Sequence, residues 1–294
     1  MKNTEVPTVD ITLNLDVNTY ETCSRMVQTV IEVLLFQRNQ IPFCFQVFRM
    51  IVKKISNGSE DNGEPSEWNN YQLNKQRETA SKSLETVNQL FEELSTAIQQ
   101  SRQKFQFLVL FGSTVYTAKE AFVINVPGIN RNHYPQYHRN ALEGSLNQLK
   151  MKLTLADNIH CKPKVTRPTN MFLLISAKTS ESTQDTMKDN ELNLDNGQLI
   201  EGYTLPSKCH KYVINLANAN GTQLHCCKEM EVFRDLTLNL EIDDACVESL
   251  REARISESSE KSENYTRAMW YQIGNGFKGY KNVSVKGKSV WNYG

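Results

Sequence analysis

Side chains that could bind a metal ion are sparse and poorly grouped in this 294-residue chain. The closest groups are His160–Cys161 and His225–Cys227, and neither has the paired ligand spacing typical of a zinc site. His133 and His138 fall in a predicted loop with no carboxylate ligand nearby. Ordinary strand and loop positions explain these residues, so we expect no metal and no other cofactor.

A nucleophilic serine or cysteine is the next candidate for chemistry. Ser113 follows an apolar run and Gly112, as a catalytic serine on a strand-end turn would, but the G-x-S-x-G pattern is absent. A hairpin turn explains Gly-Ser equally well. Gly274, Gly276 and Gly279 have the spacing of a phosphate loop but lie in an aromatic, strand-like segment that opens no helix. We expect a protein that is not an enzyme; an enzyme using Ser113 or a cysteine is an alternative from another class.

Charge and composition indicate which classes of partner and which cell compartment suit this chain. Lys and Arg number 33, as do Asp and Glu, so the net charge is zero and nothing in bulk favours nucleic acid or an anionic membrane. No apolar run approaches the roughly 20 residues of a transmembrane helix, and we expect no signal peptide. The seven cysteines are odd in number and scattered, which favours a reducing compartment, the cytosol or the nucleus.

The helix-forming stretch that organises the chain is 19–54. Apolar residues between Cys23 and Leu35 recur at i, i+3 and i+4, which predicts one helix with Asn18 and Glu21 as a capping box. A polar corner at 37–40 and then Pro42 end this helix. A second apolar set from Phe43 to Ile55 predicts a shorter helix that folds back.

The remaining pattern predicts an α+β fold in one domain, 1–294. Long helices are expected over 73–98 and from 141 to about 158. Strands are expected at 9–17, 105–112, 121–128, 171–178, 210–217, 236–242 and 269–280. Flexible loops are expected at about 56–70, 179–202 and 243–266. Three long helices on one face of a mostly antiparallel sheet is the simplest packing.

Four stretches resemble, in the same order, segments of the comet family, which binds the mitotic arrest deficient ("Mad-two") protein of the spindle checkpoint. They are FQRNQIP (36–42), LVLFG with KEAF (108–112 and 119–122), LPSKCHK (205–211), and WYQ with FKGY (270–272 and 277–280). The resemblance implies a HORMA fold, in which three helices pack on a sheet and a C-terminal "safety belt" wraps a peptide or the chain's own end.

The resemblance also implies a function without catalysis. Comet proteins bind the closed conformer of the Mad-two protein, block its dimerisation, and present it to a hexameric AAA+ remodelling ATPase, which silences the checkpoint. The implied location is the nucleus and cytoplasm, including the kinetochore or spindle in mitosis. The alternative within the same fold is a HORMA receptor that grips a closure peptide under its belt. Internal pairing of residues 270–280 would argue against that receptor.

Particular residues follow from the resemblance. Gln37 matches the family glutamine that contacts the closed partner, and Leu149-Lys150-Met151 align near a family phenylalanine, with no aromatic residue here. The expected partner-binding residues are Gln37, Arg38, Leu146, Leu149, Lys150, Met151 and Leu153. The expected belt residues are Trp270, Tyr271, Phe277 and Tyr280. The expected ATPase contacts are Tyr203 and Lys208, although 200–204 departs from the family's basic segment.

Overall fold

The computed structural model describes ten parts of the chain. They are residues 6–57, 67–100, 104–130, 139–160, 163–178, 198–200, 203–219, 269–281, 284 and 291. All belong to one compact unit drawn from Met1–Thr222 and Ala268–Gly294. The predicted strand 236–242 and loop 243–266 lie outside the described residues, so a single domain over 1–294 stays a prediction.

The elements within these residues confirm an α+β fold. The helices are α1 (Tyr20–Gln37), α2 (Phe45–Asn57), α3 (Glu67–Gln100), α4 (Arg139–Thr154) and α5 (Asp157–His160), with a 3-10 turn η1 (Val115–Thr117). The strands are β1 (Thr8–Leu13), β2 (Lys104–Gly112), β3 (Ala118–Asn125), β4 (Asn170–Lys178), β5 (Gln198–Ile200), β6 (His210–Asn218) and β7 (Met269–Lys278). None of the described helices is both long and apolar enough to cross a membrane.

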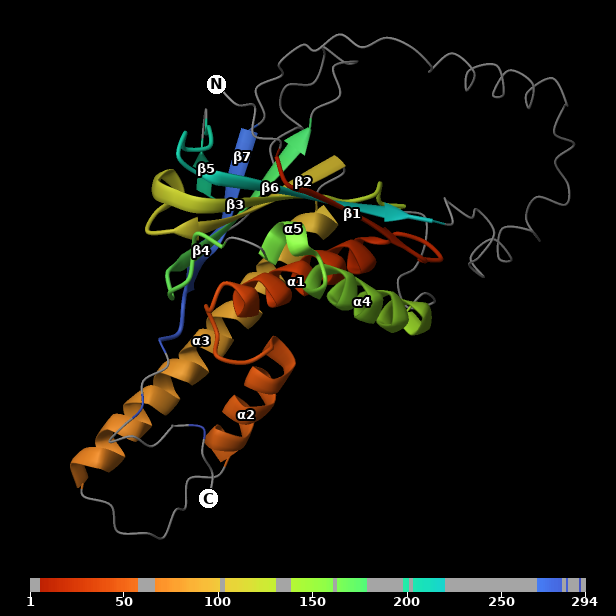
Figure 1. The fold of residues 1–294 in the computed structure, drawn as a ribbon. Helices are drawn as coiled ribbons and strands as arrows, with labels where there is room; N and C mark the ends of the chain where they lie inside the picture. The colour runs from red at the N-terminus through yellow and green to blue at the C-terminus, as the bar shows by residue number, and fades with distance from the viewer. Residues whose placement is uncertain are drawn as a thin grey trace, which may run out of the picture. The chain divides into compact units, whose positions relative to one another are not determined.

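The strands form one mixed sheet in the order β1-β6-β3-β2-β4-β7-β5 (Figure 1). The predicted hairpin is confirmed: β2 and β3 are antiparallel, with Val109 opposite Phe122. β4 and β7 continue the antiparallel pairing, as does β5 with β7. The β1–β6 and β6–β3 pairs are parallel. The expectation of a mostly antiparallel sheet therefore holds for the centre and one edge, but not for the other edge.

Strand β2 is buried on both faces, as its continuous apolar run predicts. Phe107, Val109 and Phe111 join the main core with the helices. Leu108 and Leu110 join a second cluster on the opposite face of the sheet, where Tyr203 also packs. Figure 1 shows α1, α3 and α4 on the same side of the sheet, which agrees with the predicted layering.

The start of α1 differs from the prediction. Thr19, not Asn18, is the N-cap, because the Thr19 hydroxyl accepts a hydrogen bond from the Thr22 amide at 3.2 Å. The Asn18 side chain instead donates to the carbonyls of Pro127 (2.7 Å) and Gly128 (3.1 Å). Asn18 thus joins the end of the β3 segment to α1, and the predicted capping box is wrong.

Three other regions also differ from the boundaries that the sequence predicts. α2 runs to Asn57 and α3 begins at Glu67, so both helices enter the predicted loop 56–70. The single helix expected to reach 158 is divided into α4 and α5. β5 lies inside the predicted loop 179–202. Its three residues carry too short a pattern to be detected, and it is a strand because β7 pairs with it.

Candidate protein-binding surface

The polar corner at residues 37–40 is largely buried. Arg38 is only 1% exposed. Its Nε donates to Glu120 Oε2 at 2.5 Å and its Nη2 donates to the Ile159 carbonyl at 2.9 Å. The guanidinium also lies 5.0 Å from the centre of the Phe122 ring. Arg38 therefore joins the end of α1 to β3 and α5.

Glu120 completes this ion pair from β3, where it is fully buried. Its second carboxylate oxygen accepts hydrogen bonds from the backbone amides of Lys164 and Val165. A buried pair of charges is tolerated when its remaining hydrogen-bonding groups are satisfied. The pair therefore fixes the corner to the segment that leads into β4.

Gln40 connects the same corner to the end of β7. Its buried side-chain oxygen accepts from the Thr169 amide at 2.7 Å, and its Nε2 donates to the Arg167 carbonyl at 3.3 Å. The Gln40 backbone carbonyl accepts from the Tyr280 amide at 2.8 Å. One short run of sequence thus holds α1, the segment before β4 and the C-terminal strand together.

Gln37 is half-buried rather than fully exposed at the helix end. Its Nε2 lies 3.4 Å from the Leu153 carbonyl and 3.1 Å from His160 Nε2. The amide expected to face a partner therefore braces α1 against α4 and α5. Its Oε1 is buried and has no hydrogen-bond partner among the described residues, so it does not face a partner in this conformation.

The seam between α1 and α4 is closed by two ion pairs. Arg25 Nη2 lies 3.1 Å from Glu143 Oε1, and Lys150 Nζ lies 3.6 Å from Glu32 Oε2. Residue numbers rise together in the two pairs, so the helices run parallel and their C-terminal ends lie side by side. Burial raises the pKa of Glu32, against the smaller opposing effect of Lys150.

Four of the expected partner-binding residues are buried in this chain. They are Arg38, Leu146, Leu149 and Leu153. The three leucines form the i, i+3, i+7 stripe that faces the main core. Their side chains cannot contact a partner in this conformation, so the prediction is corrected for these four. Lys150 and Met151 lie on the outer side of α4, and Met151 is 58% exposed.

Two exposed apolar residues nearby were not predicted as contacts. Phe36 at the end of α1 is 46% exposed, and Leu155 just after α4 is 71% exposed. The exposure of Phe36 could have been predicted from the sequence, because Phe36 falls outside the buried stripe of α1, which ends at Leu34 and Leu35. We define the α1–α4 end surface as Phe36, Gln37, Lys150, Met151 and Leu155.

The expected belt residues are mostly interior. Tyr271, Phe277 and Tyr280 are buried, and Trp270 is half-buried. The Tyr280 ring also packs 5.6 Å from Trp291. These aromatic side chains are therefore part of the core in this conformation.

The two expected ATPase contacts differ in exposure. Tyr203 is buried, its hydroxyl donates to the Val115 carbonyl at 3.1 Å, and burial raises its pKa to about 12. Lys208 is exposed in the turn before β6. Tyr116, which packs 6.0 Å from Tyr203, is 66% exposed. Lys208 can therefore meet a partner, whereas Tyr203 supports the surface from beneath.

In the part of the chain that the structure describes, no set of side chains is arranged for nucleophilic catalysis. The Ser113 hydroxyl makes no hydrogen bond there, and Cys23 is buried. Burial, with a smaller effect of Glu120, raises the pKa of the Cys209 thiol to about 11, which disfavours the thiolate. No group of three or more metal-ligating side chains occurs in this part either.

No family model matches the chain, and no curated protein matches it. The α1–α4 end surface can bind a protein through two exposed apolar side chains and a flexible methionine.

Proposed function

We propose that this chain is a non-enzymatic adaptor of the comet type, with a HORMA fold. It binds the closed conformer of the Mad-two checkpoint protein and blocks its dimerisation. It then presents that conformer to a hexameric AAA+ remodelling ATPase and so silences the spindle checkpoint in the nucleus and cytoplasm. The support comes from four family-like stretches in order, together with helices on one side of an α+β sheet.

The observation that carries the proposal is the exposure of Phe36, Met151 and Leu155 at the joined ends of α1 and α4. Large apolar side chains exposed together mark interaction sites more often than single ones do. The Arg38–Glu120 pair and Gln37 hold the two helix ends in place, so the surface is rigid before it binds. Phe36 on α1 supplies the aromatic anchor that α4 lacks.

The alternative, a receptor for a closure peptide, is less favoured by the pairing of β7. Gln272 of β7 lies opposite Leu174 of β4, and Tyr271 lies opposite Leu199 of β5. The edge of β4 is therefore already occupied by the chain's own strand. A peptide that adds a strand needs a free edge, so the receptor would first have to release β7.

Presentation to the ATPase is proposed to use Lys208 and Tyr116. Both are exposed, and their chain neighbours Val115 and Cys209 pack in the cluster on the far face of the sheet, together with Tyr203. A partner held at the α1–α4 end surface would leave this second surface accessible. The two contacts can then be made at once, as an adaptor requires.

The test is capture of recombinant Mad-two protein that is locked in either its open or its closed conformer. We expect the full chain to capture the closed form at least tenfold more strongly. Equal capture of both forms, or capture of neither, would overturn the proposal. Adding the ATPase to the captured closed form then tests presentation separately, with Lys208→Glu as the variant expected to lose only this step.

A further inference from the structure

The side chain of Trp291 lies among three aromatic rings that come from distant parts of the chain. Its ring centre is 5.4 Å from that of Phe43, 6.0 Å from that of Phe48 and 5.6 Å from that of Tyr280. All three contacts are edge-to-face, an arrangement that the quadrupoles of aromatic rings favour. We define Phe43, Phe48 and Tyr280 as the aromatic site.

The rings of the aromatic site are held in place by contacts that do not involve Trp291. The Tyr280 amide donates to the Gln40 carbonyl at 2.8 Å, and the Tyr280 hydroxyl donates to Gln76 Oε1 at 3.1 Å. Phe48 belongs to the main core, and its ring centre lies 6.2 Å from that of Tyr280. The aromatic site is therefore organised before an indole enters it, which lowers the cost of binding.

Trp291 has a more peripheral place in the fold than the rings around it. It lies beyond β7, which ends at Lys278, and it is half-buried at the edge of the main core. Phe43 is also half-buried, so the aromatic site reaches the surface. A tryptophan from another molecule can replace Trp291 there without opening the sheet or a helix.

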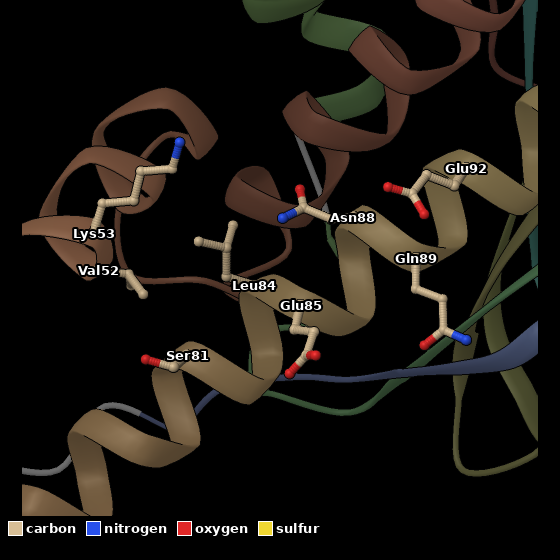
Figure 2. A pocket seen from close by; sticks show the side chains of 8 residues that line it. All are labelled: Val52, Lys53, Ser81, Leu84, Glu85, Asn88, Gln89 and Glu92. Carbon is tan, nitrogen blue, oxygen red and sulfur yellow. The ribbon is translucent and has the colours of Figure 1, made fainter. Parts of the chain in front are cut away.

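The groove of about 630 Å³ that α2 and α3 line is a different place (Figure 2). Its apolar residues, Val52 and Leu84, are only 2% and 6% exposed. Figure 2 shows polar side chains along both helices, with Lys53 on α2 and Glu85 and Gln89 on α3. An apolar ligand would therefore meet the aromatic site rather than this groove.

We propose that the aromatic site binds a tryptophan side chain carried by a peptide segment of a partner protein, and that Trp291 occupies the site until the partner arrives. The indole that lies there in this structure defines the chemistry of the ligand: one large, flat apolar side chain with a polar N–H. Binding uses side-chain contacts and no strand edge, unlike a receptor for a closure peptide. The inference does not depend on the checkpoint function, because the aromatic site includes no residue of the α1–α4 end surface.

A tryptophan on the chain's own tail competes with one that arrives from outside. A short flexible tether gives an effective concentration on the order of 1 mM. For a peptide with a Kd of about 0.1 mM, Trp291 then fills the site roughly nine-tenths of the time and raises the apparent Kd about tenfold. Removing the Trp291 indole should restore the full affinity.

The experiment uses the full chain, with and without Trp291→Ala, and a fluorescein-labelled peptide with the sequence of residues 284–294, SVKGKSVWNYG. Fluorescence anisotropy should show saturable binding to the Trp291→Ala chain and binding about tenfold weaker to the unchanged chain. The same peptide with alanine in place of tryptophan should bind neither chain. No binding to the Trp291→Ala chain, or equal affinity for both chains, would overturn the proposal.

Substitutions near the site make the test specific. In the Trp291→Ala chain, Phe43→Ala should weaken peptide binding at least about fivefold, because the closest of the three ring contacts is lost. Met50→Ala is the matched control: Met50 is 51% exposed on α2, makes none of the ring contacts, and should leave the Kd nearly unchanged. Unchanged affinity after Phe43→Ala, or binding of the peptide that lacks tryptophan, would also contradict the proposal.

A second measurement keeps Trp291 in place. The chain has three tryptophans, so fluorine NMR of the chain labelled with 5-fluorotryptophan gives three resonances, which Trp68→Phe and Trp270→Phe assign. An excess of unlabelled peptide should shift the Trp291 resonance and leave the Trp270 resonance where it is. A Trp291 resonance that does not move would show that the indole is a fixed part of the core.

Discussion

Arg38 and Glu120 form an ion pair whose side chains are 1% and 0% exposed and which joins the end of α1 to β3. Arg38 belongs to a run of polar residues that would ordinarily lie on the surface. Its burial makes the corner after α1 the point where helices, sheet and C-terminal strand are held together. The proposed binding surface is built on this point.

Removing one partner of the ion pair is expected to destabilise the fold strongly. Arg38→Met leaves the Glu120 carboxylate buried without its cation, which should lower the free energy of unfolding by about 3–5 kcal/mol. Urea denaturation measures this. In Arg38→Met with Glu120→Leu the loss should be clearly smaller than the sum of the two single losses. Additive losses would show that the two side chains do not act as a pair.

Neighbouring residues of α4 should respond differently to truncation. Leu149 is fully buried in the main core, so Leu149→Ala should cost about 2–5 kcal/mol of stability. Met151 is exposed, and Met151→Ala should change stability by less than about 0.5 kcal/mol. Thermal or urea unfolding of the two variants decides this. A small loss for Leu149→Ala would mean that α4 does not present this face to the core.

Gly279 allows the C-terminal strand to approach the corner closely. A Cβ there would lie 2.8 Å from the Thr169 carbonyl oxygen and against the side-chain oxygen of Gln40. Gly279→Ala should therefore cost about 1–3 kcal/mol. Gly144→Ala is the control, because it lies in α4 with open space around the new methyl group, and it should stabilise by up to about 1 kcal/mol. A neutral Gly279→Ala would contradict the close approach.

Cysteine alkylation should follow burial and pKa. The raised pKa of Cys209, about 11, keeps its thiol protonated, so its reactivity should still be rising between pH 9 and pH 11. Cys44 is exposed and should react faster at pH 8. Cys23 is buried and should react only on unfolding. Mass spectrometry after timed iodoacetamide treatment measures the three rates. A Cys209 rate that levels off by about pH 10, as that of an ordinary thiol does, would contradict the raised pKa.

Local periodicity was sufficient to predict α1 and β2, because their apolar spacing records burial directly. It was not sufficient to predict the burial of Arg38. The carboxylate that neutralises its charge belongs to Glu120, which is 82 positions away in the sequence. Periodicity was also not sufficient to predict what the apolar stripe through Leu149 faces. An apolar helical stripe has one appearance whether it faces a core or a partner, and only the packing against the sheet distinguishes them.

The α1–α4 end surface was predicted in part. The resemblance led to Gln37, Lys150 and Met151, and of these only Met151 is freely exposed. Phe36 was not among the expected contacts, because it directly follows the buried stripe of α1, which ends at Leu34 and Leu35. The inward turn of Gln37 depends on His160 in α5, a helix that the sequence pattern merged with α4.

The most direct test of the proposed function is the affinity of the closed Mad-two conformer for a variant of the α1–α4 end surface. Phe36→Ser with Met151→Ser should raise the Kd at least tenfold, because both large apolar side chains are exposed. Val47→Ser with Met50→Ser, two exposed apolar residues on α2, is the matched control and should leave the Kd within twofold. Unfolding midpoints should be unchanged in both variants. An unchanged Kd in the Phe36 and Met151 variant would contradict the account.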